Sequence, residues 1–547
     1  MRHTHLRAPS SDAAFLEVPP LSEIPAAVER RLPQRTFDVQ GRRSDILAEF
    51  ARGEVIAAAR DHHASMGLDA PPDDLDLGRI VATGHQPELF HPGVWVKNFA
   101  LAAIARRSGA TALNLIVDND LPKGPILRVP TMRAEGLGRE VVAFDSWTAD
   151  LPYEAQAIAD RERFADFRER VLAALGGLIP DPLIDRFWPA ALEEPPTDDP
   201  RRRHNVGLRF STARRKIEAE WGIRNLEVPL SRVCETDGFR WFASRLLAGL
   251  SDFSTIHNRA LAAYRRLYRI RSKNHPVADL GVDRDGRLEA PFWVWRDRDP
   301  RRRALWARTS GDSTSLWIAG EDQPFIVLPL SADRTACCAV ERLRELPEQG
   351  IRLRTRALTT TMFARLFLSD LFIHGIGGAK YDELGDAIME EFFGVEPPRF
   401  LTLSLTLHAG LPRSDATREA LAAAERTIRD AEFRPEVFLD ASDDPTIRAA
   451  IDRKSAAIAA STATRRERVA RFHAIRAASA EMRPFVEEHR LAAIAERSRL
   501  AASLARDAVA RSREYASVLH SAARLERIPD LVDRRIDAAR EKRAISD

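Results

Sequence analysis

Two segments far apart in the chain share one pattern: a strand, a glycine-containing loop, a helix and a second strand. In residues 78–117, a β-branched run ends at Gly84, apolar side chains then recur at helical spacing, and another apolar run follows. Residues 371–407 repeat this order around a glycine-rich loop. Two parallel strands joined by a helix need about thirty residues, which suits both segments. The sequence therefore predicts an α/β fold with a doubly wound sheet.

The rest of the chain is expected to add insertions and a helical end to this core. After Asp415 the composition shifts to Ala, Arg and Glu at helical spacing. We expect an antiparallel pair or trio of long helices there, interrupted at Pro484 and Pro529. Six segments are expected in chain order: an N-terminal helical arm (1–77), the first half of the core (78–145), a helical insertion (146–270), a mixed extended insertion (271–345), the second half of the core (346–414) and a helical, coiled-coil-like domain (415–547).

Charge and cysteine content argue against several classes of protein. The 83 Lys and Arg residues are offset by 80 Asp and Glu residues, a net charge of +3, so no basic field favours a nucleic-acid partner. Arg201–Arg203 and Arg301–Arg303 each follow an Asp-Pro pair, and we interpret them as solvated loops. The chain has three cysteines and no C-x-x-C spacing, so neither a disulfide framework nor a cysteine-based zinc site is expected.

The location of the protein is inferred from what the sequence lacks. The first residues have no apolar signal-peptide region, and no stretch approaches about 18 uninterrupted apolar residues. We therefore expect a cytoplasmic protein with no membrane partner. Cys337 and Cys338 lie in an apolar run, and we interpret them as buried structural thiols.

The loop at residues 83–93, after the first predicted strand, is the first segment suited to chemistry. Ligands of open α/β sheets bind beyond the carboxyl ends of the strands, and the free N–H groups of the next helix favour an anion. The loop carries two histidines, expected to titrate near neutrality. A zinc site with His85-x-x-Glu88-x-x-His91 is disfavoured because Pro87 prevents a regular helix. The candidate residues here are Thr83, Gly84, His85, Gln86, His91, Gly93 and Lys97.

An acidic stretch, Asp118, Asn119 and Asp120, follows the next predicted strand. Two carboxylates separated by an amide could hold an amine, bind a divalent cation or act as a base. Asp and Asn before Pro122 are as typical of a simple turn. The neighbouring loop favours the functional interpretation.

The third segment is the glycine-rich loop of the second unit, residues 374–383. Its glycines would let the backbone approach a phosphate or another anion, although the spacing matches neither G-x-G-x-x-G nor the P-loop. Upstream, either Arg354 or Arg356 could clamp a carboxylate. The candidate anion-binding residues of the loop are Gly375, Gly377 and Gly378.

Taken together, these segments resemble the cysteine-adding enzyme family of bacillithiol biosynthesis. In that family a strand leads into a T-G-Q-Q-x-x-L-F-G-G-P type loop, and a second strand ends in an E-D-H-D type stretch. Residues 83–93 and 117–120 are similar to these two stretches, in the same order. Residues 356–358, 375–381 and 397–399 are similar to the family's later L-R-P-L, G-G-P-G-E-x-x-Y and P-P-x-x-x-P-R stretches.

The resemblance implies a Rossmann-like core with two insertions and a C-terminal helical coiled-coil domain that forms a homodimer. It also implies a ligase that joins the carboxyl of cysteine to the amine of glucosaminyl-malate, an amino-sugar conjugate. Such chemistry needs an activated carboxyl, an anion site for the leaving group and a base for the attacking ammonium. The sequence does not identify the cofactor; ATP or another nucleotide would activate the carboxyl.

The site assignment combines the three segments with the resemblance, and it includes no metal ligand. The alternative is a non-catalytic scaffold whose helical tail binds a partner. The assigned residues are His85, Asp118 and Asp120 as catalytic groups; Thr83, Gly84, Gln86, His91, Lys97, Asn119, Arg356, Tyr381 and Arg399 as groups that bind the small-molecule substrate; and Gly93, Gly375, Gly377 and Gly378 as cofactor-binding groups.

Overall fold

Two separate units make up the chain, and the first of them holds the main sheet. The first unit comprises residues 1–129, 140–409 and 513–547, and the second comprises residues 130–139 and 410–512. About 51% of the residues are helical. None of the helices in the described ranges has an apolar stretch as long as a bilayer crossing requires. The structure is a computed structural model and describes residues 6–30, 35–68, 75, 77–134, 136–148, 150–197, 199–439 and 442–544.

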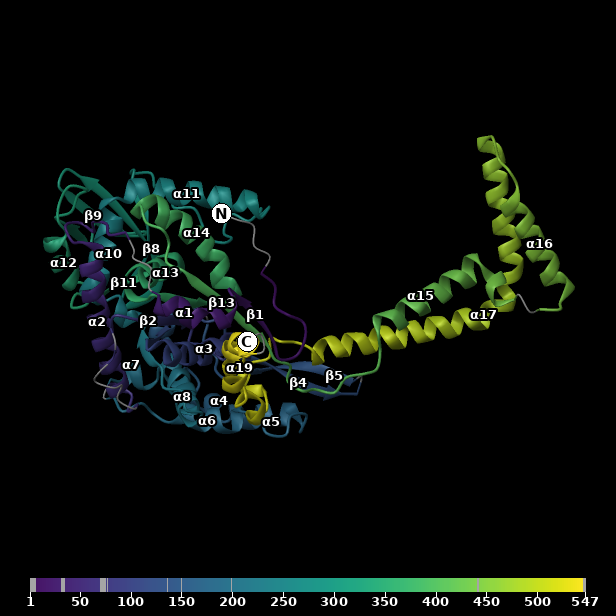
Figure 1. Cartoon of the computed structure of the whole chain (residues 1–547), viewed down its shortest axis with the longest axis horizontal. Coiled ribbons are helices and arrows are strands. Elements are labelled where there is room, and N and C mark those ends of the chain that lie inside the picture. The colour runs from purple at the N-terminus through teal and green to yellow at the C-terminus, as the bar shows by residue number, and fades with distance from the viewer. Residues whose placement is uncertain are drawn as a thin grey trace. The chain divides into compact units, whose positions relative to one another are not determined.

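The main sheet has six strands, and most of them run parallel (Figure 1). In sheet order they are β1 (Ala14–Val18), β13 (Phe400–Thr406), β12 (Leu371–His374), β2 (Ile80–His85), β3 (Thr111–Ile116) and β6 (Leu226–Pro229). β1 pairs antiparallel with β13 at one edge, and the other pairs are parallel. From β2 the chain adds β3 and β6 on one side, and later β12 and β13 on the other. The strand order therefore reverses between β2 and β12.

The predicted α/β fold with a parallel-dominated sheet is confirmed, with two strands added to it. β1 lies in the expected helical arm, and β6 lies in residues 146–270, which are expected to be a helical insertion. Both strands are short, five and four residues, and such brief apolar runs cannot be told from buried helix by periodicity.

Helices cover both faces of this sheet. α2 (Ser44–Ser65), α10 (Asp237–Ala248) and α14 (Ile376–Phe393) contribute to one buried cluster that includes Ile80 and Ala82 of β2. Side chains of a strand alternate between the two faces. α3 (Pro92–Ser108) packs on β2, β3 and β13 from the other face, and α19 (Ile528–Ala544) packs on α3.

A second, antiparallel sheet belongs to the first unit and supplies further residues near the site. Four of its five strands lie in residues 271–345, the mixed extended insertion predicted from sequence, and the fifth lies in residues 346–414. One of the four includes Arg301–Arg303, where the sequence predicts a loop. In sheet order the strands of this second sheet are β10 (Ile326–Leu328), β9 (Ser313–Ile318), β8 (Asp299–Ser310), β7 (Leu288–Arg296) and β11 (Ile351–Thr355).

Two further strands, β4 (Ile126–Arg133) and β5 (Gly136–Ala143), pair only with each other among the described strands.

Shorter helices connect these elements, and most lie in residues 150–270, where the sequence predicts helix. They are α1 (Ile24–Glu29), α4 (Arg161–Ala165), α5 (Phe167–Leu175), α6 (Ile184–Leu192), α7 (Pro200–Arg203), α8 (Val206–Glu220), α9 (Leu230–Val233), α11 (Leu250–Leu267), α12 (Cys337–Arg344), α13 (Ala357–Phe363) and α18 (Ala522–Leu525).

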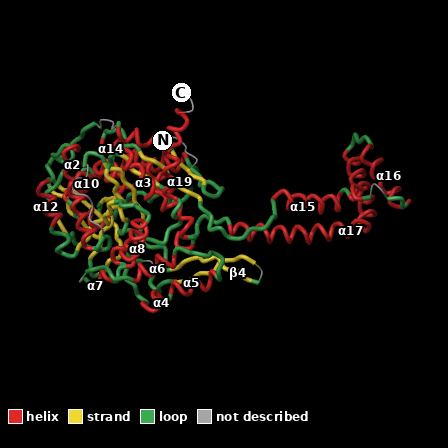
Figure 2. Tube along the Cα trace, turned by 60° about the horizontal axis from the view of Figure 1, so that its bottom comes forward, coloured by secondary structure: helices red, strands yellow, loops and turns green. Residues whose placement is uncertain are grey.

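The second unit is a set of long helices, α15 (Arg418–Phe433), α16 (Pro445–Ala459) and α17 (Arg465–Ala510), shown side by side in Figure 2. Both shorter helices run antiparallel to α17, because Glu432 pairs with Arg483 and Arg453 pairs with Glu481. The expected interruption at Pro484 is wrong, since α17 continues through it. A proline removes one backbone hydrogen bond, but packing against neighbouring helices can hold such a helix together.

A buried ionic cluster joins α8 and α3 to the main sheet. Arg214 donates to Glu218 at 2.8 Å and to Glu227 of β6 at 2.9 Å, and all three side chains are at least 95% buried. Glu218 also accepts from Trp95 and Asn98 of α3 at 2.6 and 2.7 Å. Burial opposes ionisation of Glu227, but Arg214 outweighs it and lowers the pKa of this carboxyl to about 2.

We expect the Arg214→Met substitution to lower the free energy of unfolding by about 3–5 kcal/mol, because it leaves two carboxylates buried without their cation. Urea denaturation followed by circular dichroism would measure the change. Arg301→Met is the matched control: Arg301 pairs with Asp299 at an exposed position, so its loss should have little effect. Equal stability of the Arg214→Met and wild-type proteins would contradict this role of the cluster.

Candidate active site

The carboxyl edge of the main sheet brings together the three segments predicted from sequence. Thr83 of β2 lies beside Ile373 of β12, and His85 lies beside Ile116 of β3. The loops that follow these three adjacent strands therefore start next to one another. This edge is also where the strand order reverses, the position at which open α/β sheets bind ligands.

The β2–α3 loop is held by buried polar contacts. The Thr83 hydroxyl donates to the carbonyl of Ile373 at 2.8 Å. The ring nitrogens of His85 lie 3.1 Å from the carbonyl of Gln86 and 3.0 Å from Oδ1 of Asn98. Burial lowers the pKa of His85 to about 3, so the expectation that it titrates near neutrality is wrong.

The start of α3 is filled by side chains of the protein. Nδ1 of His91 accepts from the N–H of Gly93 at 3.1 Å, and burial lowers the pKa of His91 to about 4. A methyl group on Gly93 would collide with His91, with the Leu405 carbonyl and with the guanidinium of Arg513. Close packing thus accounts for Gly93, and little room is left there for a phosphate.

Lys97 places a buried cation directly behind this loop. Its side chain is 5% exposed, and Nζ donates to the carbonyl of Gly84 at 2.8 Å. Among the described residues, no carboxylate forms an ion pair with Lys97. Burial lowers the pKa of Lys97 to about 8. When Lys97 is protonated, no acid among the described residues neutralises its charge.

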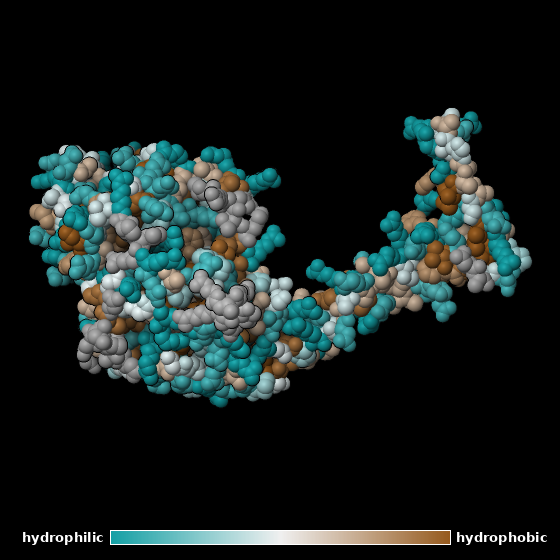
Figure 3. Space-filling model, in the orientation of Figure 1, coloured by the Kyte–Doolittle hydropathy of each residue, from teal (hydrophilic) through white to brown (hydrophobic). Residues whose placement is uncertain are grey.

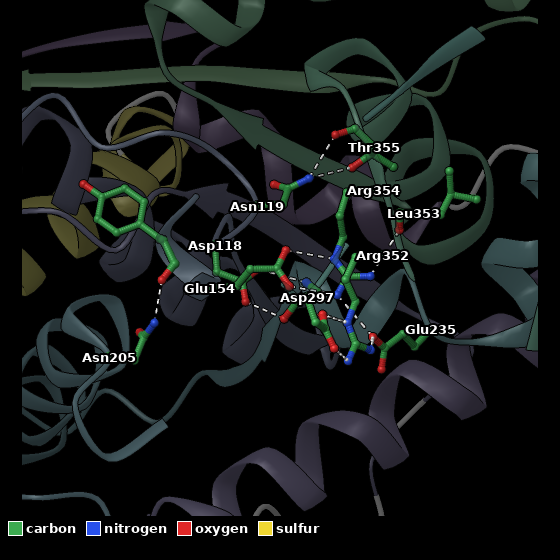
Figure 4. A network of polar contacts seen from close by, with 12 residues as sticks. Asp118, Asn119, Glu154, Asn205, Glu235, Asp297, Arg352, Leu353, Arg354 and Thr355 are labelled. Atoms are coloured by element: carbon green, nitrogen blue, oxygen red, sulfur yellow. Dashed lines mark hydrogen bonds and ion pairs between the residues drawn. The ribbon is translucent and has the colours of Figure 1, made fainter. Parts of the chain in front are cut away.

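Asp118 lies just beyond the end of β3, beside Glu154 (Figure 4). Its carboxylate accepts from the N–H of Ser231 at 2.8 Å and from the Ser231 hydroxyl at 2.5 Å. Burial and the nearby carboxylate of Glu154 raise the pKa of Asp118 to about 7. Asp118 nevertheless keeps part of its surface exposed. It is therefore a carboxyl group that can gain or lose a proton near neutral pH.

The charges around Asp118 are fixed by Arg354, which is 3% exposed. Arg354 donates to both carboxylate oxygens of Glu154, at 2.9 and 2.8 Å, and to Glu235 at 3.1 Å (Figure 4). These acids outweigh the effect of burial and raise the pKa of Arg354 above its ordinary value. The carboxylate of Glu154, held by Arg354, opposes a second negative charge on Asp118.

Asn119 and Asp120 connect the acidic stretch to other elements. The amide of Asn119 donates to the carbonyl of Thr355 at 2.9 Å. Asp120 accepts from the amide of Gln86 at 2.9 Å and from Arg302 at 2.8 Å. Gln86 and Asp120, predicted separately as site residues, are therefore in direct contact.

Two arginines stack on Trp293 of β7 beside this stretch. The guanidinium carbons of Arg356 and Arg302 lie 4.1 and 5.0 Å from the ring centroid of Trp293. Arg356 also donates to Glu289 at 2.6 Å. Arg356 thus already pairs with Glu289. It would bind a substrate carboxylate only alongside Glu289 or in place of it.

The β12–α14 loop combines a tight contact with open space. His374 lies 2.5 Å from Asp382, and a Cβ on Gly378 would collide with the His374 ring. Within the described residues, no atom of another segment lies within 4 Å of a Cβ placed on Gly375 or Gly377, and no side chain caps the start of α14. A nucleotide phosphate would therefore fit at this helix start, in contrast to the start of α3. Tyr381 lies one turn along α14, with its ring 6.3 Å from that of His275.

Arg399 lies away from the other candidate residues. It precedes β13, whose seven residues span about 20 Å, so Arg399 is at the amino edge of the parallel sheet. There it lines a cavity of about 1680 Å³ together with parts of the N-terminal arm and α2. The structure thus separates Arg399 from the carboxyl-edge site.

Several residues at this edge are missed by the sequence analysis. Ser231 follows the unexpected strand β6, and Glu154 lies in the predicted insertion. Arg302 lies within β8, where the sequence predicts a solvated loop, although its neighbours Arg301 and Arg303 do have the expected local partner Asp299. No spacing rule links these residues to Asp118 or Asp120; the alternation of apolar Leu226 and Val228 around Glu227 is the signal that could have located the strand before Ser231.

No metal site is found: within the ranges that the structure describes, no three His, Cys, Asp or Glu residues are grouped to hold an ion. Comparison with known proteins adds no assignment either. The chain matches no model of a known protein family, and no curated protein is similar enough in sequence to count as a match. The function must therefore be inferred from the residues of the site.

The raised pKa of Asp118 has a consequence for stability. Between about pH 4 and 7 the folded state keeps a proton that the unfolded state has released, so the free energy of unfolding should fall as pH rises, by up to about 1.4 kcal/mol per unit. Asp118→Asn cannot titrate and should lose this slope. Urea denaturation at pH 5, 6, 7 and 8 would measure it.

The control for this experiment is Asp312→Asn, at a carboxylate with a 79% exposed side chain, whose pH profile should run parallel to that of the wild type. If the difference between Asp118→Asn and wild type does not change with pH, Asp118 does not hold a proton near neutrality.

Proposed function

We propose that the protein is an enzyme of the carbon–nitrogen ligase type, with its active site at the carboxyl edge of a Rossmann-like sheet. The observation that carries the proposal is the position of Asp118 and Lys97. Asp118 follows β3, Lys97 lies in the helix after the adjacent strand β2, and the strand order reverses on the other side of β2. Burial brings the pKa of each group towards neutrality from opposite directions. Perturbed titratable groups at such an edge are typical of catalytic sites.

These two groups suit the formation of an amide from a carboxyl and an amine. The attacking amine must lose a proton as its nitrogen bonds to the carbonyl carbon, and Asp118 would accept that proton. Lys97, with no carboxylate partner, would stabilise the negative charge that develops on the carbonyl oxygen or on a substrate carboxylate. Ser231 and Glu154 would position and tune Asp118.

A nucleotide, when bound, would supply the activation of the carboxyl. Gly375 and Gly377 border open space at the uncapped start of α14, and Lys380 lies in the following turn. We assign an anion, such as a nucleotide phosphate, to this helix start. The resemblance of the three segments to the cysteine-adding family suggests cysteine and an amino-sugar conjugate as the pair to be joined.

The test is to incubate the purified protein with ATP, cysteine and glucosaminyl-malate and to detect the amide by mass spectrometry. We expect Asp118→Asn and Lys97→Met each to lower the rate about 100-fold or more, and the rate of the wild type to rise through about pH 7 as Asp118 loses its proton. Asp312→Asn should behave as wild type. Failure to form a nucleotide-dependent amide with this pair would overturn the substrate assignment.

A wider panel of amino acids and amines tests the substrate assignment and the reaction type independently. Amide formation with another pair, still lost in Asp118→Asn and Lys97→Met, would keep the active site and replace the substrates. The ligase proposal would fail if no pair of the panel gave a nucleotide-dependent amide, or if both variants were as active as the wild type.

We also propose that the helical unit forms a coiled-coil-like interface with a second copy of the chain. Figure 3 shows hydrophobic surface over α15, α16 and α17. Large apolar patches of this kind usually mark contact surfaces. The exposed apolar residues, each 47–55% exposed, are Phe433, Val437, Ile458, Val469, Phe472, Phe485 and Leu491.

Sedimentation equilibrium would test this proposal. We expect the wild type to be a dimer, and the double variant Phe472→Asp/Phe485→Asp to be a monomer with unchanged helix content, because charge on the apolar surface prevents its burial. Val282→Asp, at a 64% exposed apolar residue of the first unit, is the control and should stay dimeric. A monomeric wild type would exclude the dimer and favour the alternative function, a scaffold whose helices bind another protein.

A further inference from the structure

Cys337 and Cys338 stand at the start of α12, and both are exposed, so the prediction that they are buried structural thiols is wrong. The apolar face of α12, which carries Ala339, Val340 and Leu343, is the buried one. The thiols lie on the other face, where an apolar side chain gains nothing from burial. Packing therefore does not explain why two cysteines occur here.

The two sulfur atoms are spaced as ligands of one ion would be. Their separation is 3.7 Å. Two sulfur ligands at about 2.3 Å from a tetrahedral zinc ion lie roughly 3.8 Å apart. The existing arrangement thus needs almost no change to bind a single tetrahedral ion through both sulfurs.

A disulfide between these residues would be strained instead. Adjacent Cα atoms across a trans peptide are about 3.8 Å apart, whereas disulfides usually need about 4.4–6.8 Å. The sulfurs would also have to approach to about 2.05 Å. The pair is therefore expected to stay as two thiols, which keeps both sulfurs free for a ligand.

The surroundings of the pair favour thiolate and then a cation. The Thr335 hydroxyl lies 3.5 Å from Sγ of Cys337 and can donate a hydrogen bond to its thiolate. Cys337 is the first residue of α12, where the free N–H groups also favour negative charge. Glu341, one turn further on, adds a negative charge that would attract a cation once the thiols ionise.

We propose that Cys337 and Cys338 form an accessible binding site for one thiophilic d¹⁰ cation, with Zn²⁺ as the best fit. On binding, each thiol releases its proton to solvent, two metal–sulfur bonds form, and four of the six water ligands of the aqueous ion leave, so that two waters remain. No third His, Cys, Asp or Glu is preplaced in the described part of the chain, so water completes the shell. Such an open site exchanges its ion, unlike a closed structural zinc site.

Titration of the reduced, tag-free chain with Cd²⁺ tests the site, because thiolate-to-cadmium charge transfer absorbs in the ultraviolet. We expect one equivalent of Cd²⁺ per chain, at least tenfold weaker binding in both Cys337→Ser and Cys338→Ser, and displacement by Zn²⁺. Cys234→Ala, which removes the buried third cysteine, is the control and should bind as wild type. The two serine variants lie on an exposed helix face, so circular dichroism should show unchanged folding.

The proposal fails if no saturable absorption appears by one equivalent, or if either serine variant keeps wild-type affinity. An independent measurement uses iodoacetamide. Zn²⁺ should slow alkylation of Cys337 and Cys338 at least tenfold, as read by peptide mass spectrometry, and equal rates with and without Zn²⁺ would overturn the site. Because α12 is not part of the carboxyl-edge site, neither result bears on the ligase proposal.

Discussion

The position of the candidate site depends on one buried group of charges. Arg214 of α8 pairs with Glu218 of α8 and Glu227 of β6 in the interior, and Glu218 also accepts hydrogen bonds from Trp95 and Asn98 of α3. A buried charge without a partner costs several kcal/mol of free energy, so a shift of α3 or α8 that broke these contacts with β6 would destabilise the folded state. The cluster thus holds α3 in place, and with it the loop at the end of β2, to which Asn98 is joined through His85.

The same physical effect, desolvation, shifts two groups at this edge in opposite directions. It makes the ammonium of Lys97 easier to deprotonate and the carboxyl of Asp118 harder to ionise. These two groups differ from the charges nearby in their partners. Glu154 and Arg354 pair with each other, whereas among the described residues Lys97 contacts a backbone carbonyl and Asp118 contacts Ser231. Groups without a matching charge are those that a substrate can still influence.

Two groups of side chains elsewhere in the chain are exposed to solvent although their residue types usually lie in the interior. The helices of the second unit leave seven large apolar side chains about half exposed, and α12 leaves two thiols exposed on its solvent face. In both cases the residue type is poorly suited to water. The two proposals made above would account for this exposure, an apolar partner surface for the helices and a soft cation for the thiols.

Local pattern in the sequence was enough to predict the parallel α/β core, because strand and helix periodicity are properties of neighbouring residues. It also located the ends of β2, β3 and β12, although most of the loop predicted at 374–383 is the start of α14. Proximity of Gln86 to Asp120 could be expected from that topology, since loops after adjacent parallel strands start side by side. Tertiary structure alone decided the rest. It buried His85 and so removed its titration near neutrality, placed Arg399 at the far edge, and brought Ser231, Glu154 and Arg302 to the acidic stretch. Burial and pairing are set by residues distant in the chain, and no spacing along the sequence encodes them.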